Sequence, residues 1–334
     1  MSFSISDILA ARRLIRDKAD ATPLVPSPYM ASVAGQDFLL KLEIAQPIGA
    51  FKLRGALNAV MNLPRGVPGV VCASTGNHGR GVAWAAKAQG LRAVVCMSAL
   101  VPQVKVAAIR ALGAEVRIAG QSQDAAQAEV DRLVAAEGLA EIPPFDNPFV
   151  IAGQGTIGLE ILEARPDVET LLVPLSGGGL AAGVALAAKS CNPSVKVIGV
   201  SMDRGAAMYA SLAAGRPVEV DEVASLADSL GGGIGLHNAY SFRLCQRYLD
   251  GAVRVTEEEI RDAMQALYYE DRIVAEGASV VGLAAVLSGK VNLTACAATI
   301  ITGRNLDMAQ FTRIVAGQDV RLGDRVVQGK MYGT

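Results

Sequence analysis

A single lysine stands where a helix is expected to begin, in the segment PIGAFKLRGALNAV at residues 47–60, which contains no acidic residue. An exposed Lys52 would meet the positive end of the helix dipole, and a buried one would lose its hydration. Both effects lower the pKa of the amine, as a nucleophilic or Schiff-base lysine requires. The ordinary alternative is a surface lysine whose aliphatic chain covers apolar neighbours.

Three consecutive glycines follow an apolar segment and precede a helical one in VPLSGGGLAAGVALAAKS, residues 173–190. Glycines let backbone N–H groups converge, and the start of a helix adds positive potential, so this turn suits a phosphate group. The P-loop lysine and the G-x-G-x-x-G spacing of dinucleotide sites do not occur here. The segment therefore indicates a small phosphorylated cofactor, with a tight turn that binds nothing as the alternative.

Two further loops carry polar groups at the ends of strand-like segments. ASTGNHGRG at residues 73–81 offers the side chains of Ser74, Thr75, Asn77 and His78 beside a run of N–H donors, which suits a carboxylate. The alternative is a capped helix start in which His78 is a structural hydrogen-bonding group. TIITGRNLDM at residues 299–308 offers the hydroxyl of Thr302.

The elements that must position these loops follow a βαβ rhythm. Strands are expected at 69–75, 92–98 and 114–120, and again at 170–175, 195–201 and 297–302, with alanine-rich helices between them. A helix with a capping box is expected after Thr256, because Glu259 follows three residues later. This alternation predicts an α/β protein with parallel sheets covered by helices on both faces. The segment 141–149, rich in proline, is expected to cross from the first series to the second.

Composition excludes several classes of protein. The 334 residues carry a formal net charge of −1 without a basic block, which argues against a nucleic-acid partner. No apolar run approaches the ~20 residues of a membrane span, and no signal peptide is recognisable. The five cysteines form no C-x-x-C pair and are expected to be reduced and buried in a cytoplasmic protein. The presence of only two histidines argues against a histidine-based zinc site, and no separate regulatory domain is expected.

These pieces together match the requirements of pyridoxal 5′-phosphate, which needs a Schiff-base lysine, a phosphate anchor, a substrate carboxylate anchor and a partner for the pyridine nitrogen. The sequence also resembles the serine/threonine dehydratases and serine racemases of the fold-type II pyridoxal-phosphate enzymes, from TPLV at 22–25 to the C-terminal region. The motifs that carry the resemblance are FKLRGA (51–56), STGNHGRG (74–81), PPFDNPFVIAGQGTIGLEI (143–161), VPLSGGGLAAG (173–183), EGASVVGLAAVL (276–287) and TGRN (302–305).

The resemblance implies a fold like that of the tryptophan synthase β subunit, with a large cofactor-binding domain at 1–67 and 147–334 and a small mobile domain at 68–146. It implies that Lys52 forms the Schiff base and acts as the base at Cα. The other cofactor contacts that it implies are Phe51, Asn77 at the 3-oxygen, Ser176, Gly177, Gly178, Gly179 and Leu180 at the phosphate, Glu276, and Thr302 at the pyridine nitrogen. Ser74, Thr75, Asn77 and His78 would hold the substrate carboxylate, and Thr75 is also expected to be catalytic.

A hydroxyl at Thr302, in place of a carboxylate, would leave the pyridine nitrogen largely unprotonated, which weakens the electron sink and favours elimination of a β-substituent over a long-lived carbanion. Thr75 stands where the racemases carry a serine base, which argues against racemase activity. Ser201 and Ala207 stand where metal-dependent relatives carry a glutamate and an aspartate, so no metal is expected, although Asp203 lies nearby.

Two arginines suggest which substrate is preferred. Arg304 replaces a glycine beside the cofactor and Arg80 follows the asparagine loop, so we expect them to bind a second anion, with solvated or structural arginines as the alternative. The motifs look closest to hydroxyectoine-utilisation dehydratases and 3-hydroxyaspartate dehydratases. The expected activity is removal of water from such a substrate by a homodimer. The alternatives are a threonine or serine dehydratase, a serine or aspartate racemase, a β-replacement synthase, and a cofactor-carrying binding protein without turnover.

Overall fold

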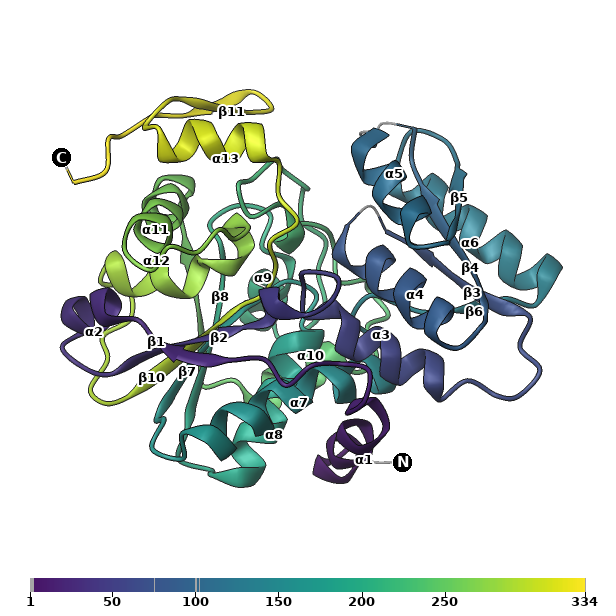
Figure 1. Ribbon diagram of the computed structural model, residues 1–334, viewed down its shortest axis with the longest axis horizontal. Coiled ribbons are helices and arrows are strands. Elements are labelled where there is room, and N and C mark those ends of the chain that lie inside the picture. Colours follow the sequence, from purple (N-terminus) through teal and green to yellow (C-terminus); the bar gives the residue numbers. More distant parts are fainter. Residues whose placement is uncertain (1–2, 75, 100, 102, 334) are drawn as a thin grey trace.

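The structure is a computed structural model that describes residues 3–74, 76–99, 101 and 103–333. Two separate sheets dominate it (Figure 1). In spatial order, the larger sheet consists of β1 (Leu24–Pro26), β2 (Phe38–Leu42), β10 (Ala297–Ile301), β7 (Thr170–Pro174), β8 (Lys196–Met202) and β9 (Gly251–Val255). The smaller sheet consists of β5 (Glu115–Ile118), β4 (Arg92–Met97), β3 (Gly69–Ala73) and β6 (Ala140–Glu141). All neighbours in these two sheets are parallel except β1 and β2, which confirms the predicted α/β class.

The smaller sheet has a helical layer on each face. Val70 and Cys72 of β3 pack with α4 (Asn77–Ala88) and α5 (Gln103–Ala111), whereas Val71 and Ala73 pack with α6 (Gln123–Glu137). This alternation follows from the two-residue period of a strand. The sheet is built from residues 69–141, inside the segment expected to form the small domain; the division into two domains stays a prediction.

The larger sheet is also covered on both faces. Helices α1 (Ile5–Ile15), α7 (Pro148–Ala164), α8 (Gly179–Cys191) and α10 (Ser241–Tyr248) lie on one side, and α2 (Pro28–Ala34), α11 (Glu257–Tyr269), α12 (Val281–Leu287) and α13 (Met308–Val315) lie on the other. The remaining elements are α3 (Lys52–Met61), α9 (Ala207–Ala214), the hairpin β11 (Val320–Leu322) and β12 (Arg325–Val327), and the 3-10 turns η1 (Glu43–Ala45), η2 (Asp228–Leu230) and η3 (Gly277–Ser279). The buried apolar side chains of both faces form the core of this part of the molecule.

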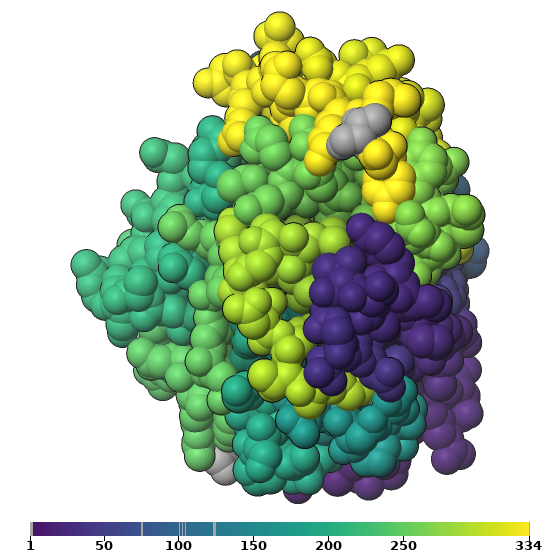
Figure 2. All heavy atoms as spheres, turned by 90° about the vertical axis from the view of Figure 1, so that its left-hand side faces the viewer, coloured from purple at the N-terminus to yellow at the C-terminus, as the bar shows by residue number. Residues whose placement is uncertain are grey.

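The C-terminal segment folds back over α11, as the yellow spheres above the green ones show in Figure 2. The ring of Tyr332 stacks on Tyr269 with centroids 4.8 Å apart, and its hydroxyl donates a hydrogen bond to Glu270 at 2.7 Å. These contacts attach the end of the described chain to α11 in the outer helical layer of the large sheet.

Several local predictions are confirmed and others are corrected. The capping box is present, since Thr256 Oγ1 accepts from the N–H of Glu259, and Glu259 Oε2 accepts from the N–H of Thr256. Most expected strands end one or two residues early, because the chain has already turned into the polar loops. The expectation that all cysteines are buried is wrong: Cys191 is exposed and Cys296 is half-buried. Within the described residues, no helix is long and apolar enough to cross a membrane.

Candidate active site

Lys52 is the first residue of α3, so its side chain leaves the helix where the backbone N–H groups are unpaired. Its amine donates a hydrogen bond to the carbonyl oxygen of Pro144 at 2.6 Å, and no described carboxylate forms an ion pair with it. Burial lowers the pKa of this amine from 10.5 to about 8, which confirms the predicted direction. The residue is partly rather than fully buried, as suits an amine that must meet a small molecule. The ring of Phe51 lies beside it, with 5.5 Å between Nζ and the ring centroid.

The glycine turn lies between β7 and α8. Gly178 has φ of +88°, which only glycine adopts without strain, and a Cβ added there would lie 2.6 Å from Met208 Cε. The carbonyl of Gly177 accepts a hydrogen bond from Ser241 Oγ at 2.7 Å, which fixes the turn from α10. No described group accepts from the N–H groups of residues 176–178, so these donors are available to an anion.

The crossing segment connects the lysine with the glycine turn. The backbone of Phe145 lies against Gly179 and its ring against Gly177, so that a Cβ at either glycine would come within 2.3 to 2.9 Å of Phe145. Asp146 accepts hydrogen bonds from three consecutive N–H groups at the start of α10, those of residues 239, 240 and 241, at 2.6 to 2.8 Å. The sequence motif contained this segment, but nothing in its residue types indicated that its backbone would contact Lys52.

Asn77 is placed by a polar network across the two sheets. Its Nδ2 donates to both carboxylate oxygens of Glu276 at 3.0 Å, and its Oδ1 accepts from Asn305 Nδ2 at 2.7 Å. Burial raises the pKa of Glu276, partly offset by the hydrogen bonds that Asn77 and Ser229 donate to it. Asn305 was missed in the sequence, although it directly follows the singled-out Arg304. The structure brings Asn77 and Glu276 together as the predicted set requires.

Ser74 and His78 lie at the start of α4. Ser74 Oγ accepts from the N–H groups of Gly76 and Gly79 at 3.3 and 3.0 Å, so it caps this helix. Burial and the nearby Lys52 cation lower the pKa of His78 to about 3, so its ring is neutral, and its Nε2 donates to Ile142 O at 2.7 Å. These contacts agree with the structural alternative for both residues. Thr75 lies outside the described residues.

Thr302 directly follows β10 and is buried beside a second hydroxyl. Its Oγ1 lies 3.0 Å from Ser279 Oγ, which also donates to the carbonyl of Gly303 at 2.9 Å. The carbonyl of Thr302 accepts the N–H of Phe51 at 3.0 Å, so the strand end is joined to the residue before Lys52. Ser279 was missed as a site residue, although it lies in the same motif as Glu276. A neutral hydroxyl pair carries no negative charge that would stabilise a protonated pyridine nitrogen.

The two arginines are placed differently. Arg80 is half-buried and its Nη1 donates to Asn305 Oδ1 at 2.7 Å, so it has a polar partner within the Asn77 network. Arg304 is exposed, and its side chain lies over Gly49, whose added Cβ would meet Arg304 Cγ at 3.2 Å. A Cβ on Gly49 would also lie 3.3 Å from Asn305 Oδ1, the atom that accepts from Arg80, and a shared role of the two arginines toward a substrate anion stays a prediction.

The positions at which metal-dependent relatives carry acidic ligands lie near the end of β8 and at the start of α9. Ser201 is buried near the end of β8, and Ala207 begins α9. Among the described residues, the one group of three side chains close enough to share a metal ion is Asp37, Asp167 and Cys296, which is far from these positions in the sequence. Arg165 already lies within it, donating to Asp37, Asp167 and Cys296. The chain's own cation therefore already contacts all three side chains and offsets part of their negative charge.

These residues fit pyridoxal 5′-phosphate. The partly buried amine without a carboxylate partner can form a Schiff base, and the free N–H donors of the glycine turn can hold a phosphate. Asn77 would bond to the 3-oxygen of the cofactor ring and the Thr302 hydroxyl to its pyridine nitrogen. When bound, the cofactor supplies an electron sink for loss of a proton from the substrate Cα.

Comparison with protein families matches residues 15–303 to the model described as pyridoxal-phosphate dependent enzyme. The chain is 53% identical to a Sinorhizobium fredii protein provisionally assigned as a threonine dehydratase, over 95% of this chain and 96% of that one. It is 41% identical to the L-threonine ammonia-lyase of Thermotoga maritima, over 97% of this chain and 80% of that one.

Solved structures agree with these relatives. Maize serine racemase superposes with a TM-score of 0.88 at 30% identity, covering 94% of this chain and 97% of that one. Threonine deaminase isoform 2 from Solanum lycopersicum gives 0.86 at 36% identity, covering 93% and 91%. The chain therefore belongs to the pyridoxal-phosphate dependent enzymes, as a fold-type II lyase of the threonine dehydratase and serine racemase-like group.

Proposed function

We propose that this enzyme removes water from an uncharged β-hydroxy amino acid, L-threonine in the first place and L-serine in the second. The resulting enamine would become an imine that hydrolyses to a 2-oxo acid and ammonia. The observation that carries the proposal is the neutral hydroxyl pair of Thr302 and Ser279, which would face the pyridine nitrogen and is joined through Phe51 to Lys52. The relatives named for threonine support the choice of substrate.

Several residues of the candidate site have a proposed role in this reaction. The amine of Lys52, with its pKa near 8, is partly unprotonated at neutral pH and can accept the proton from Cα. Ser74, Thr75 and the N–H groups at the start of α4 would hold the substrate carboxylate. Asn77 is held in place by Glu276 and Asn305, so it can present a fixed donor to the cofactor.

A substrate with a second carboxylate, such as 3-hydroxyaspartate, is the second candidate. It is favoured by the half-buried Arg80. It is disfavoured by the exposure of Arg304 and by the hydrogen bond that already links Arg80 to Asn305. Burying a guanidinium without an anion is costly, but a neutral amide oxygen and the nearby Glu276 reduce that cost here.

A substrate panel tests the proposal directly. Purified enzyme is assayed with threonine, serine and 3-hydroxyaspartate by release of oxo acid and ammonia, in the wild type and in Arg80→Gln and Arg304→Gly. We expect kcat/KM for threonine to exceed that for 3-hydroxyaspartate at least tenfold, and Arg304→Gly to leave this ratio within threefold. A preference for 3-hydroxyaspartate that either substitution abolishes would establish the second candidate.

Two expectations accompany this function. Conversion of L-serine to D-serine should be slow compared with deamination, which chiral chromatography of the reaction mixture measures. The enzyme is proposed to be a cytoplasmic homodimer, so light scattering should give a mass near twice the 34.6 kDa of one chain.

A further inference from the structure

Three helices connect the two ends of the cofactor site. Helix α3 begins with Lys52, α8 begins at the glycine turn, and α7 lies between them (Figure 1). We propose that α7 is a spacer that fixes the separation between the Schiff-base lysine and the phosphate-binding turn. Its glycines set this separation, which makes them positioning residues for the cofactor.

The contact between α7 and α3 is made by backbone. A Cβ added to Gly153 of α7 would lie 2.5 Å from the carbonyl oxygen of Arg54 and 2.7 Å from Gly55 Cα. Only glycine permits this approach, and the atoms it meets are backbone atoms that cannot rotate away. The helices therefore meet two residues after Lys52, within the first turn of α3.

The contact between α7 and α8 has the same character. A Cβ on Gly183 of α8 would lie 2.4 Å from Ile151 O and 2.7 Å from the nitrogen of Gly155. A Cβ on Gly158 would lie 2.9 Å from the carbonyl oxygen of Val184. Glycine inside a helix is unfavourable by about 1 kcal/mol relative to alanine. Three glycines within one helix of 17 residues therefore need a reason, and the close approach on both sides supplies it.

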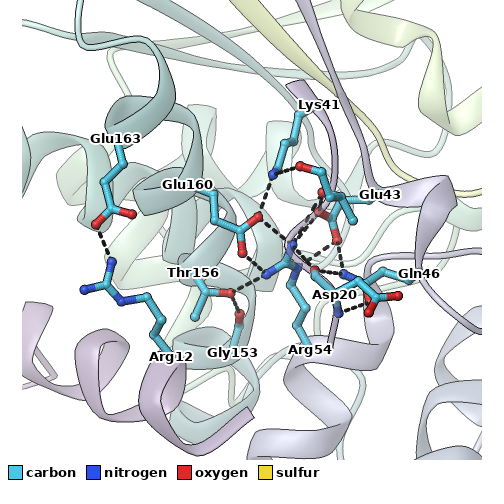
Figure 3. A network of polar contacts seen from close by, with 11 residues as sticks. Arg12, Asp20, Lys41, Glu43, Gln46, Arg54, Gly153, Thr156, Glu160 and Glu163 are labelled. Atoms are coloured by element: carbon cyan, nitrogen blue, oxygen red, sulfur yellow. Dashed lines mark hydrogen bonds and ion pairs between the residues drawn. The ribbon is translucent and has the colours of Figure 1, made fainter. Parts of the chain in front are cut away.

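An ion-pair network prevents α3 from rotating about its own axis where it packs against α7. Arg54 is 2% exposed and bonds to Glu43 at 2.8 Å and to Glu160 of α7 at 2.5 Å, while Lys41 bonds to Glu160 at 2.5 Å (Figure 3). Arg54 Nη1 also donates to Thr156 Oγ1 at 3.1 Å. Arg54 lies two residues after Lys52 and so points away from it around the helix, which leaves the lysine facing the site.

The segment before α7 shows how close the two anchors are. Pro144 bonds to Lys52 and the next residue, Phe145, lies on Gly177 and Gly179. Adjacent Cα atoms are about 3.8 Å apart, so the amine and the turn flank one dipeptide. A cofactor held at both ends binds more tightly than through either end alone, provided that the spacing matches its length.

The test measures binding at the Schiff-base lysine and at the phosphate-binding turn separately and together. Full-length enzyme freed of cofactor is titrated with pyridoxal 5′-phosphate, with pyridoxal, which lacks the phosphate, and with inorganic phosphate as a competitor. In Gly153→Ala the new methyl must push α3 from α7, because no side chain can move aside. We expect affinity for pyridoxal 5′-phosphate to fall at least tenfold, while affinities for pyridoxal and for phosphate each stay within threefold of the wild type.

Two control variants accompany this titration. Gly251→Ala places a methyl where no atom lies within 4 Å, and should change none of the three affinities. Leu162→Ala shortens a buried side chain of α7 without pushing on another helix. It should lower the melting temperature but leave the affinity for pyridoxal 5′-phosphate unchanged relative to those for pyridoxal and phosphate. If Gly153→Ala does not fold, Gly158→Ala is judged by the same criterion. The spacer role would be overturned if the affinity for pyridoxal 5′-phosphate did not change. It would also be overturned if the affinity for pyridoxal or for phosphate fell as much as that for pyridoxal 5′-phosphate.

Discussion

The amine of Lys52 donates its hydrogen bond to the backbone carbonyl of Pro144, 92 residues further along the chain. A carbonyl orients the amine without neutralising it, as a carboxylate would. The pKa of Lys52 can therefore remain near 8, because burial is not compensated by an opposite charge. This relationship explains how the enzyme keeps a reactive amine ready without an acidic partner.

Replacing Lys52 should abolish turnover and leave the fold intact. Lys52→Ala removes both the cofactor attachment and the proposed base, so kcat should fall by several orders of magnitude while the far-ultraviolet circular dichroism spectrum is unchanged. Borohydride treatment of the yellow wild-type enzyme should attach the cofactor to the peptide that contains Lys52, as peptide mass spectrometry shows. Attachment to another lysine would refute the assignment.

The same lysine should make stability depend on pH in the cofactor-free protein. Between about pH 8 and 10.5 the unfolded chain binds a proton at Lys52 that the folded chain does not, so this group's contribution to the free energy of unfolding rises with pH. Lys52→Met lacks this rise. We expect the variant to be more stable below pH 8, by at most about 3 kcal/mol, with the advantage shrinking as pH increases. Urea unfolding at pH 7, 8 and 9 measures it, and an advantage that grew with pH would contradict the lowered pKa.

The buried ion pairs around Arg54 should be far more important for stability than those on the surface. Arg54→Met leaves Glu43 buried without its partner, and breaking such a pair costs about 3–5 kcal/mol. Arg92→Met is the matched control, because Arg92 also contacts two glutamates but is 39% exposed, and should cost less than about 1 kcal/mol. Urea titration of both variants checks the difference. Equal losses would show that burial does not set the strength of these pairs.

Activity should survive removal of divalent cations. Ser201 and Ala207 offer no carboxylate at the positions where metal-dependent relatives are expected to have them. Treatment with EDTA followed by dialysis should leave kcat/KM within twofold, measured by oxo-acid release. A large loss that magnesium restores would point to a cation site built from other groups, with Asp203 the first residue to replace.

The sequence alone determined the family-level features of this protein, because these depend on local patterns. The short β-branched run of β3 and the glycines between β7 and α8 act over a few residues. The first predicted a buried parallel strand correctly, and the second predicts a phosphate-binding turn. The lowered pKa of Lys52 was likewise foreseeable from its apolar neighbours.

Tertiary structure decided the features that depend on contacts between distant residues. The carbonyl of Pro144, the Asn77–Glu276 pair and the Arg54 network join residues 92, 199 and up to 119 positions apart, and residue type alone does not specify such partners. The same holds for Arg304: its exposed side chain lies over Gly49, a neighbour that residue type did not specify, and its binding of a substrate anion stays a prediction. A charged side chain reveals what it can bind, and only the packing of the backbone around it decides whether it faces the site.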